Sequence, residues 1–277
     1  MRTSYQSNTL HLFLTLCARY DSGMFINQRR EPFVVRAFGV QCSGGHRPFF
    51  IYDNLSETPV VNFLRENARE FLNICTVARY QGRGNLQIDC YADYLIEHRH
   101  VDWTLFCDTD EIFVGNIRDA VAEFGGNYNC LSFSPILHGC NGKIYDDGGG
   151  MFERFENDVA APAHHWYKFV ARTADIVSIP NPHCNIMSGK RLKYLTAANY
   201  PQCTLHHFRY RSFEEFIIKI KRGTCLCLSE RDRHKMAEFF EANPTISQTA
   251  PEVVALMQNH GVNLETVQKY FDVYPSN

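Results

Sequence analysis

The sequence has no long hydrophobic run and no strong excess of one charge. Its best candidate for a membrane segment, Leu10–Ala18, is nine residues long and contains a histidine, whereas a membrane-spanning helix needs about 20 apolar residues. The 28 basic and 30 acidic side chains leave a formal net charge of −2, which argues against nucleic acid as a partner. No basic region with a small-residue cleavage site marks a signal peptide. We therefore expect a cytoplasmic protein without a membrane span or anchor.

Zinc-binding knuckles are also missing, although the chain has 11 cysteines. The paired CxxC or CxxH spacings of structural zinc sites do not occur, and Cys225 and Cys227 form only a CxC. An odd number of cysteines without regular spacing does not fit a disulfide framework. We expect mostly buried, reduced thiols, which agrees with a cytoplasmic location.

The pattern of hydrophobic residues predicts a layered α/β protein. Short apolar runs alternate with amphipathic stretches through the first two-thirds of the chain. The expected strands are Leu10–Ala18, Phe49–Tyr52, Leu72–Val77, Trp103–Cys107, Cys130–Ser134, Tyr167–Val177 and Thr204–Phe208. The expected helices are Thr58–Phe71, Asn85–His98, one that begins at a Ser212/Glu215 capping box, and others from Ser229 onward with breaks at Pro244 and Gly261. We expect a catalytic domain over residues 1–228 and a helical cap over 229–277, packed on the same domain.

The strongest chemical signal is a group of acids after the expected strand Trp103–Cys107. Asp108, Asp110 and Glu111 follow it directly, at the end of the strand where open α/β sheets place their ligands. Two carboxylates separated by one residue can face one divalent cation, and such oxygen ligands suit Mg²⁺ or Mn²⁺. The pattern predicts metal-assisted departure of a phosphate group. The alternative is a surface turn with solvated acids.

Two further groups of polar residues support a site at this edge of the sheet. Asp53 ends the expected strand Phe49–Tyr52. Later in the chain, His206 and His207 precede two arginines and the start of a helix. A neutral imidazole can complete a metal site, and guanidinium groups bind phosphate oxygens.

Four segments in order resemble the GT-A glycosyltransferases of the DUF23/glycosyltransferase family 92 group, to which soluble glycosyltransferases of large algal viruses are similar. Along the chain, these segments are Phe50–Ser56, Trp103–Phe113 (WTLFCDTDEIF), Trp166–Val170 with His183, and His207–Phe216 with Lys219 and Gly223. The resemblance extends over about Leu10 to Gly223. It implies a GT-A (Rossmann-like) mixed sheet flanked by helices, a nucleotide-sugar donor with UDP-sugar preferred, and a glycan acceptor.

The same resemblance implies roles for individual residues. Asp108, Asp110 and His207 would hold Mn²⁺ or Mg²⁺, with His206 or His183 as alternatives to His207. Asp108 would also reach the ribose of the donor. Further donor-binding candidates are Arg19, Asp21 and Asp53 for the nucleoside and Lys168, Arg211 and Lys219 for the diphosphate. Arg19 and Asp21 stand where members of the family have a "KNE"-like turn, so this chain departs from the family there.

An inverting transfer needs a general base that takes the proton of the acceptor hydroxyl. The glycine-rich stretch Gly139–Gly150 contains Asp146 and Asp147, and Glu153 follows it. We rank Asp147 first, and the alternative is that both aspartates form turns. Aromatic residues that could stack on a sugar, or belong to the core, are Tyr145, Phe152, His164, His165 and Trp166.

Two other functions compete with a metal-dependent, inverting hexosyl- or pentosyltransferase. Haloacid-dehalogenase-like phosphohydrolases also have an apolar strand followed by DxD, whose first aspartate is the nucleophile. In that family the motif follows the first strand, however, and the histidines near residue 206 would have no role. A catalytically inactive module that binds nucleotide-sugar or glycan is the second alternative, against which the intact DxD and His207 argue.

Overall fold

A computed structural model describes residues 10–16, 49–53, 59–67, 69–79, 86–156, 167–221 and 230–262 of the chain. The chain divides into two compact units. Unit 1 comprises Met1–Pro135 with His165–Leu205, and unit 2 comprises Ile136–His164 with His206–Asn277. This division differs from the expected boundary after residue 228, because two earlier segments group with the C-terminal helices.

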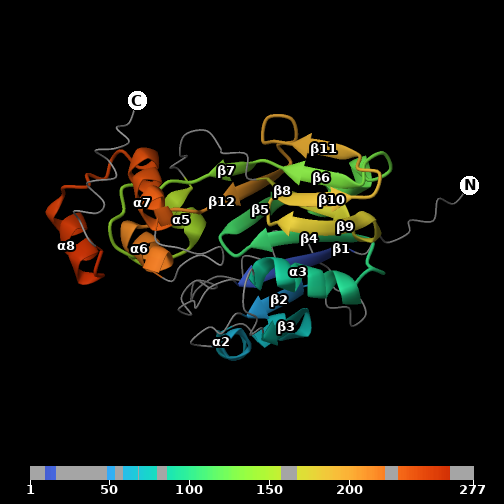
Figure 1. The fold of residues 1–277 in the computed structure, drawn as a ribbon, viewed down its shortest axis with the longest axis horizontal. Coiled ribbons are helices and arrows are strands. Elements are labelled where there is room, and N and C mark those ends of the chain that lie inside the picture. Colours follow the sequence, from blue (N-terminus) through green and yellow to red (C-terminus); the bar gives the residue numbers. More distant parts are fainter. Residues whose placement is uncertain are drawn as a thin grey trace, which may run out of the picture. The chain divides into compact units, whose positions relative to one another are not determined.

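A seven-stranded mixed sheet forms the centre of unit 1, in the order β11-β6-β8-β4-β1-β2-β3 (Figure 1). Its strands are β1 (Leu10–Leu16), β2 (Phe49–Asp53), β3 (Cys75–Arg79), β4 (Trp103–Asp108), β6 (Cys130–Phe133), β8 (Lys168–Arg172) and β11 (Leu192–Leu195). Neighbouring strands are parallel except at β8, which runs antiparallel to both β4 and β6. The predicted mixed α/β fold is confirmed.

The strand order reverses between β1 and β4. From β1 the chain continues through β2 and β3 on one side, and β4 then pairs with β1 on the other. Asp53 and Asp108 end β2 and β4, and they pair with the adjacent residues Leu16 and Thr15 of β1. The two acids therefore lie at the same edge of the sheet, as predicted, and Asp108 lies at the switch point where such sheets bind ligands.

Helices and two smaller sheets accompany this sheet. The helical segments of unit 1 are α2 (Val60–Asn67), η2 (Arg69–Asn73), α3 (Leu86–Glu97), α4 (Ile117–Phe124) and η3 (Thr173–Asp175). The additional strands are β5 (Glu111–Gly115), β9 (Ile176–Asn181), β10 (Cys184–Met187) and β12 (Cys203–His207), with β7 (Pro135–Leu137) completing the order β5-β12-β7. The strand expected over Tyr167–Val177 was wrong in extent, since β8, η3 and β9 replace it.

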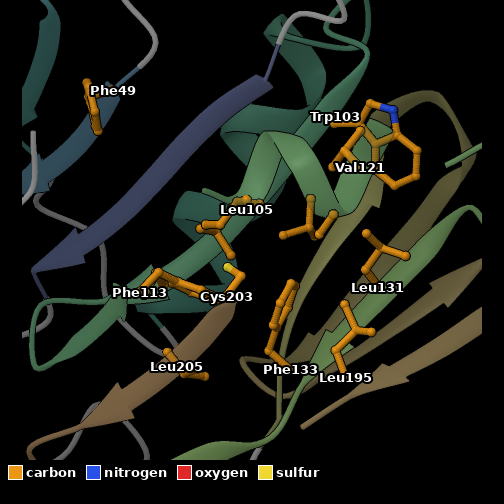
Figure 2. Packing of buried hydrophobic residues seen from close by; sticks show 14 of the residues in the cluster. Phe49, Trp103, Leu105, Phe113, Val121, Leu131, Phe133, Leu195, Cys203 and Leu205 are labelled. Carbon is orange, nitrogen blue, oxygen red and sulfur yellow. The ribbon is translucent and has the colours of Figure 1, made fainter. Parts of the chain in front are cut away.

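Apart from Thr104, strand β4 is apolar up to Asp108, because both of its faces are covered. Trp103, Leu105 and Cys107 pack in one cluster with α2, α4 and β12, and Figure 2 shows part of this packing. Phe106 points to the opposite cluster, where it contacts residues of α3 and β8. Burial on both sides holds β4 rigidly, and with it the acids that follow.

Strand β5 was not predicted. Its last residue, Gly115, lies very close to the backbone that leads into β12. Its φ is +106°, a conformation that disfavours residues with a Cβ. A Cβ at this position would lie 2.0 Å from the carbonyl oxygen of Gln202. The chain therefore needs glycine where β5 ends beside the segment that leads into β12.

Unit 2 contains the helices α5 (Met151–Phe155), α6 (Phe213–Lys221), α7 (Glu230–Ala242) and α8 (Pro251–Asn259). Phe213 and Phe239 belong to its apolar core, which contains residues of α6, α7 and α8. The capping box of α6 is confirmed, because the Glu215 N–H donates to Ser212 Oγ at 3.3 Å and the Ser212 N–H donates to Glu215 Oε2 at 3.2 Å.

Seven cysteines lie in the part of the chain that the structure describes, and all seven are free. Six are buried, and Cys184 is exposed. This agrees with the expectation of mostly buried thiols for the described positions. No helix within these ranges is both long and apolar enough to cross a bilayer.

Candidate functional site

The acids of the DxD motif occupy the turn between β4 and β5. Asp108 is the last residue of β4, and its side chain is 30% exposed. Asp110 lies in the turn and is 5% exposed, and Glu111 opens β5 and is buried. The turn therefore holds three carboxylates within four consecutive residues, and the Asp108 carboxylate is partly open to solvent.

Lys168 of β8 neutralises part of this negative charge from inside the protein. Its side chain is completely buried, and Nζ lies 2.8 Å from Asp108 Oδ2 and 3.2 Å from Glu111 Oε2. Burial disfavours the charged ammonium, but the two carboxylates outweigh it and raise the pKa of Lys168 well above its ordinary value. The ammonium is therefore buried against protein carboxylates, and the expected diphosphate contact stays a prediction.

Gln87 of α3 holds the other oxygen of Asp108. Its Nε2 donates to Asp108 Oδ1 at 2.5 Å and to the hydroxyl oxygen of Tyr91 at 2.7 Å. Sequence reasoning missed Gln87. The available signal was a polar residue at the start of the buried stripe that continues with Tyr91 and Tyr94.

Glu111 links the side chain of Lys168 to the backbone of the turn. Its Oε2 accepts the N–H of Asp108 at 3.0 Å. Burial raises the pKa of Glu111 to about 7, with Lys168 opposing the rise and the Asp108 and Asp110 charges adding to it. The four ionisable side chains thus form one electrostatic unit.

The carboxylates at this turn suit a divalent cation such as Mg²⁺. Nowhere in the described ranges do three His, Cys, Asp or Glu side chains gather as metal ligands would. Asp108 and Asp110 lie in unit 1, and His207 belongs to unit 2. Mg²⁺ commonly binds through one or two carboxylates together with substrate phosphates and water. The residues present fit a cation that binds together with a diphosphate, and they do not form a closed protein site.

Asp53 has a structural contact that the sequence did not predict. The residue is 2% exposed, and its Oδ2 accepts the N–H of Val60 at 3.0 Å. This bond satisfies an N–H group at the start of α2. The carboxylate thus anchors α2, although we had expected it to contact a nucleoside.

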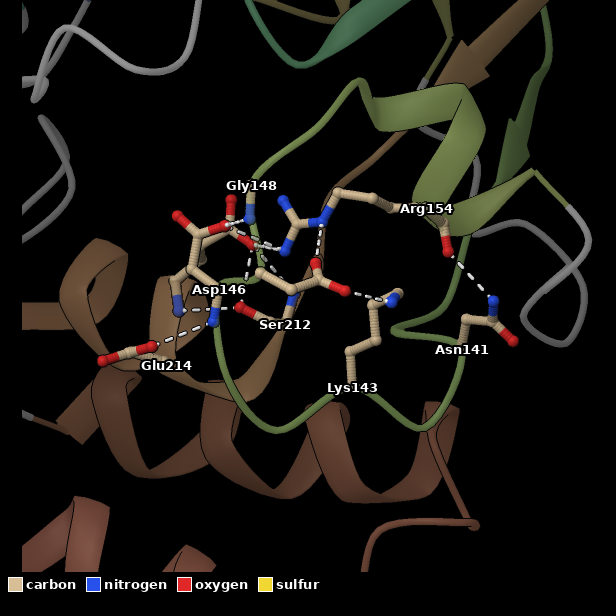
Figure 3. Close-up of polar contacts among 9 residues, drawn as sticks. Asn141, Lys143, Asp146, Gly148, Arg154, Ser212 and Glu214 are labelled. Atoms are coloured by element: carbon tan, nitrogen blue, oxygen red, sulfur yellow. Dashed lines mark hydrogen bonds and ion pairs between the residues drawn. The ribbon is translucent and has the colours of Figure 1, made fainter. Parts of the chain in front are cut away.

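In unit 2, Arg154 forms ion pairs with the acids of the loop before α5, as Figure 3 shows. The Arg154 side chain is 7% exposed and forms ion pairs with Asp146 at 3.1 Å, Asp147 at 2.8 Å and Glu215 at 2.7 Å. Lys143 pairs with Asp147 as well. The hydrogen bond from Lys143 lowers the pKa of Asp147, and the Arg154 charge acts in the same direction. A carboxylate held in this way is a weak general base.

Hydrogen bonds join the same loop to the first turn of α6, and Figure 3 shows the one between Asp146 and Glu214. The carbonyl oxygens of Lys143 and Ile144 accept the N–H groups of Phe213 and Glu214 at 3.1 and 2.9 Å. The Glu214 carboxylate in turn accepts the N–H of Asp146 at 2.9 Å. The loop thereby satisfies donors that a helix start leaves unpaired. Within the loop, Asp146 Oδ1 accepts the N–H of Gly148 at 3.0 Å, which favours the turn-forming interpretation of Asp146.

We predict that acid destabilises this arrangement. Burial opposes ionisation of Glu215, but the hydrogen bond and charge of Arg154 outweigh it and lower the pKa of Glu215. The unfolded chain therefore takes up the proton more readily, and the free energy of unfolding should decrease as pH falls below about 4.5. Thermal unfolding between about pH 3 and 7 should show a weaker pH dependence in Glu215→Gln than in the wild type. Equal dependence would contradict the assignment.

His206 forms a hydrogen-bonded pair with His138. His138 Nδ1 lies 3.0 Å from the carbonyl oxygen of Phe155, to which it must donate, and its Nε2 lies 2.9 Å from His206 Nδ1. When the His138 ring carries one proton, His206 Nδ1 is the donor and His206 Nε2 has the lone pair. Burial, followed by the influence of His138, lowers the pKa of His206 to about 4, so the ring is neutral at pH 7.

The other predicted residues are placed as follows. His207 is 7% exposed, and its carbonyl oxygen accepts the N–H of His138 at 3.0 Å. Lys219 Nζ donates to the carbonyl oxygen of Arg209 at 3.3 Å, and His183 Nδ1 donates to that of Tyr167 at 3.3 Å. The remaining positions are Arg211 (buried, φ +54°), Glu153 (exposed, α5), Tyr145 (50% exposed) and Phe152 (ring centroid 5.0 Å from His206). Arg19, Asp21, His164, His165 and Trp166 lie outside the described residues.

Comparison with known proteins shows only distant similarity. No family model matches the sequence, and no curated protein matches it, so membership of the DUF23/glycosyltransferase 92 group is not confirmed. Among solved structures, GalNAc-T7 with UDP, GalNAc and Mn²⁺ is similar with a TM-score of 0.44 and 11% identity, over 98% of this chain and 57% of that chain. TarS 1–349 of S. aureus has a TM-score of 0.36 and 14% identity, over 95% and 78%. HddC from Yersinia pseudotuberculosis has a TM-score of 0.41 and 7% identity, over 72% and 93%.

Proposed function

We propose that this protein transfers a sugar from a nucleotide-sugar, with UDP-sugar the preferred class, to a hydroxyl group of a glycan. The observation that carries the proposal is the position of Asp108 and Asp110. They follow β4 where the strand order reverses at β1, the place where open α/β sheets bind ligands. The four ordered sequence motifs add independent support.

The chemistry of the turn suits a diphosphate leaving group. Asp108 and Asp110 would hold Mn²⁺ or Mg²⁺, which when bound would neutralise charge that develops on the departing nucleoside diphosphate. Lys168 orients the Asp108 carboxylate through its 2.8 Å ion pair. The partly exposed side of Asp108 remains for the donor.

The proposal rests on unit 1 alone, and the other predicted residues, His206, His207 and Glu153, lie in unit 2. Within unit 2, the contact of His206 with His138 leaves Nε2 as the nitrogen with a lone pair. The choice of His207 rests on its motif position. For an inverting reaction, Glu153 on α5 becomes the first candidate base, since Asp146 and Asp147 are both paired with Arg154.

A donor-hydrolysis assay tests the proposal. The purified chain is incubated with Mn²⁺ and a panel of UDP- and GDP-sugars, and release of the nucleoside diphosphate is measured with and without EDTA. We expect slow hydrolysis of at least one donor that stops in EDTA. Release of phosphate from simple monoesters would contradict a transferase and favour the phosphohydrolase. Donor binding without turnover in the presence of glycan acceptors would instead favour a binding module.

A further inference from the structure

Both carboxylate oxygens of Asp108 are held by side chains of neighbouring elements. Gln87 of α3 donates to Oδ1 at 2.5 Å, and Lys168 of β8 donates to Oδ2 at 2.8 Å. The backbone N–H of Asp108 is also bound, because it donates to Glu111 Oε2 at 3.0 Å. The residue thus has little freedom to rotate even though its side chain is 30% exposed.

The partners of Asp108 are themselves fixed. Lys168 is completely buried and also contacts Glu111 at 3.2 Å, while Gln87 is 6% exposed and bonded to Tyr91. A buried ion pair is weak evidence for stability, because apolar residues of similar volume often replace it without loss. A buried lysine that reaches a partly exposed carboxylate is therefore better explained by orientation of that carboxylate.

We infer that Lys168 is a positioning residue, which acts with Gln87 to fix the Asp108 carboxylate for a nucleoside diphosphate and its divalent cation. The inference rests on the proposed function and assigns Lys168 a different role from direct contact with phosphate. Groups that orient a metal- or ligand-binding side chain typically change affinity by about 10- to 100-fold when they are removed. Lys168 and Gln87 approach Asp108 from two elements, so each alone restricts only one oxygen.

The test measures binding of UDP in the presence of Mn²⁺ by calorimetry, which does not depend on turnover. We expect Lys168→Met to weaken binding about 10- to 100-fold, and Gln87→Leu to weaken it as well. Thr104→Val is the matched control. Thr104 is buried in β4, and its Oγ1 bonds Thr173 Oγ1 at 2.8 Å and the Tyr94 hydroxyl at 3.3 Å. This variant therefore loses buried hydrogen bonds without touching Asp108. Its affinity for UDP should equal that of the wild type.

A second variant addresses the risk that Lys168→Met does not fold. Lys168→Met combined with Glu111→Gln removes one charge of each sign, so it leaves a smaller uncompensated charge in the protein. We expect this variant to fold and still to bind UDP more weakly than the wild type. Circular dichroism checks the fold in each case.

A background without the Asp108 charge separates positioning from a general structural effect. If Lys168 acts through Asp108, Lys168→Met should cause little further loss of UDP binding in Asp108→Asn. A purely structural effect would give the same loss in both backgrounds and would overturn the inference, as would a folded Lys168→Met with wild-type affinity. If the wild type binds no nucleotide with Mn²⁺, the proposed function itself fails and the inference fails with it.

Discussion

Replacement of Asp110 by alanine is expected to lower Mn²⁺-dependent donor hydrolysis about a thousandfold. A metal ion that neutralises a leaving diphosphate contributes several kcal/mol to transition-state stabilisation, and each 1.36 kcal/mol changes the rate by a factor of about ten. Asp110 lies in the turn beside Asp108 and is 5% exposed, so water cannot readily replace its carboxylate. The measurement is the initial rate of nucleoside diphosphate release at saturating Mn²⁺.

Asp93→Ala provides the control for this variant. Asp93 is an exposed acid on α3 of the same unit, and its removal changes the net charge by the same amount. We expect wild-type hydrolysis in this control. If Asp110→Ala keeps more than about a tenth of the wild-type rate while circular dichroism shows a native fold, Asp110 does not hold the catalytic metal.

Arg154→Met is expected to lower the free energy of unfolding by about 3 kcal/mol. Loss of one partner from a buried ion pair leaves charges without compensation, which costs about 3–5 kcal/mol in proteins. Arg154 is 7% exposed and holds Glu215, which is 17% exposed, together with the half-exposed Asp146 and Asp147. Because water can solvate the two aspartates, the lower end of that range applies. Urea denaturation followed by circular dichroism measures the change.

Lys143→Met separates this effect from the loss of any cation near the loop. Lys143 is 28% exposed and pairs only with the half-exposed carboxylate of Asp147 among the ion pairs of the described residues. Exposed pairs of this kind contribute about 1 kcal/mol or less, so the control should unfold close to the wild type. Similar losses in both variants would show that burial of Arg154 is not what stabilises the loop.

Hydrophobic patterning predicted most strands of the central sheet because they contain short apolar runs, but it missed β11. Trp103–Cys107 is the clearest case: it is buried on both faces, and Thr104 is its only polar residue. The capping box at Ser212 and Glu215 was also predictable from the sequence, because its contacts join residues only three positions apart. The strand expected over Tyr167–Val177 was wrong in extent, since a 3-10 turn separates β8 from β9.

The sequence by itself determined the mixed α/β fold and the placement of Asp108 and Asp110 at the end of β4, since both follow from residues that are close along the chain. Only the tertiary structure decided what surrounds these acids. Lys168 reaches Asp108 across 60 residues and Gln87 across 21, and no local pattern encodes such pairs. The same holds for Arg154, whose contact with Glu215 spans 61 residues. Arg154 also binds Asp147, the residue that we had expected to be the general base. A buried charge needs a partner of opposite charge, and that partner lies on an element that comes close only when the sheet and helices have assembled.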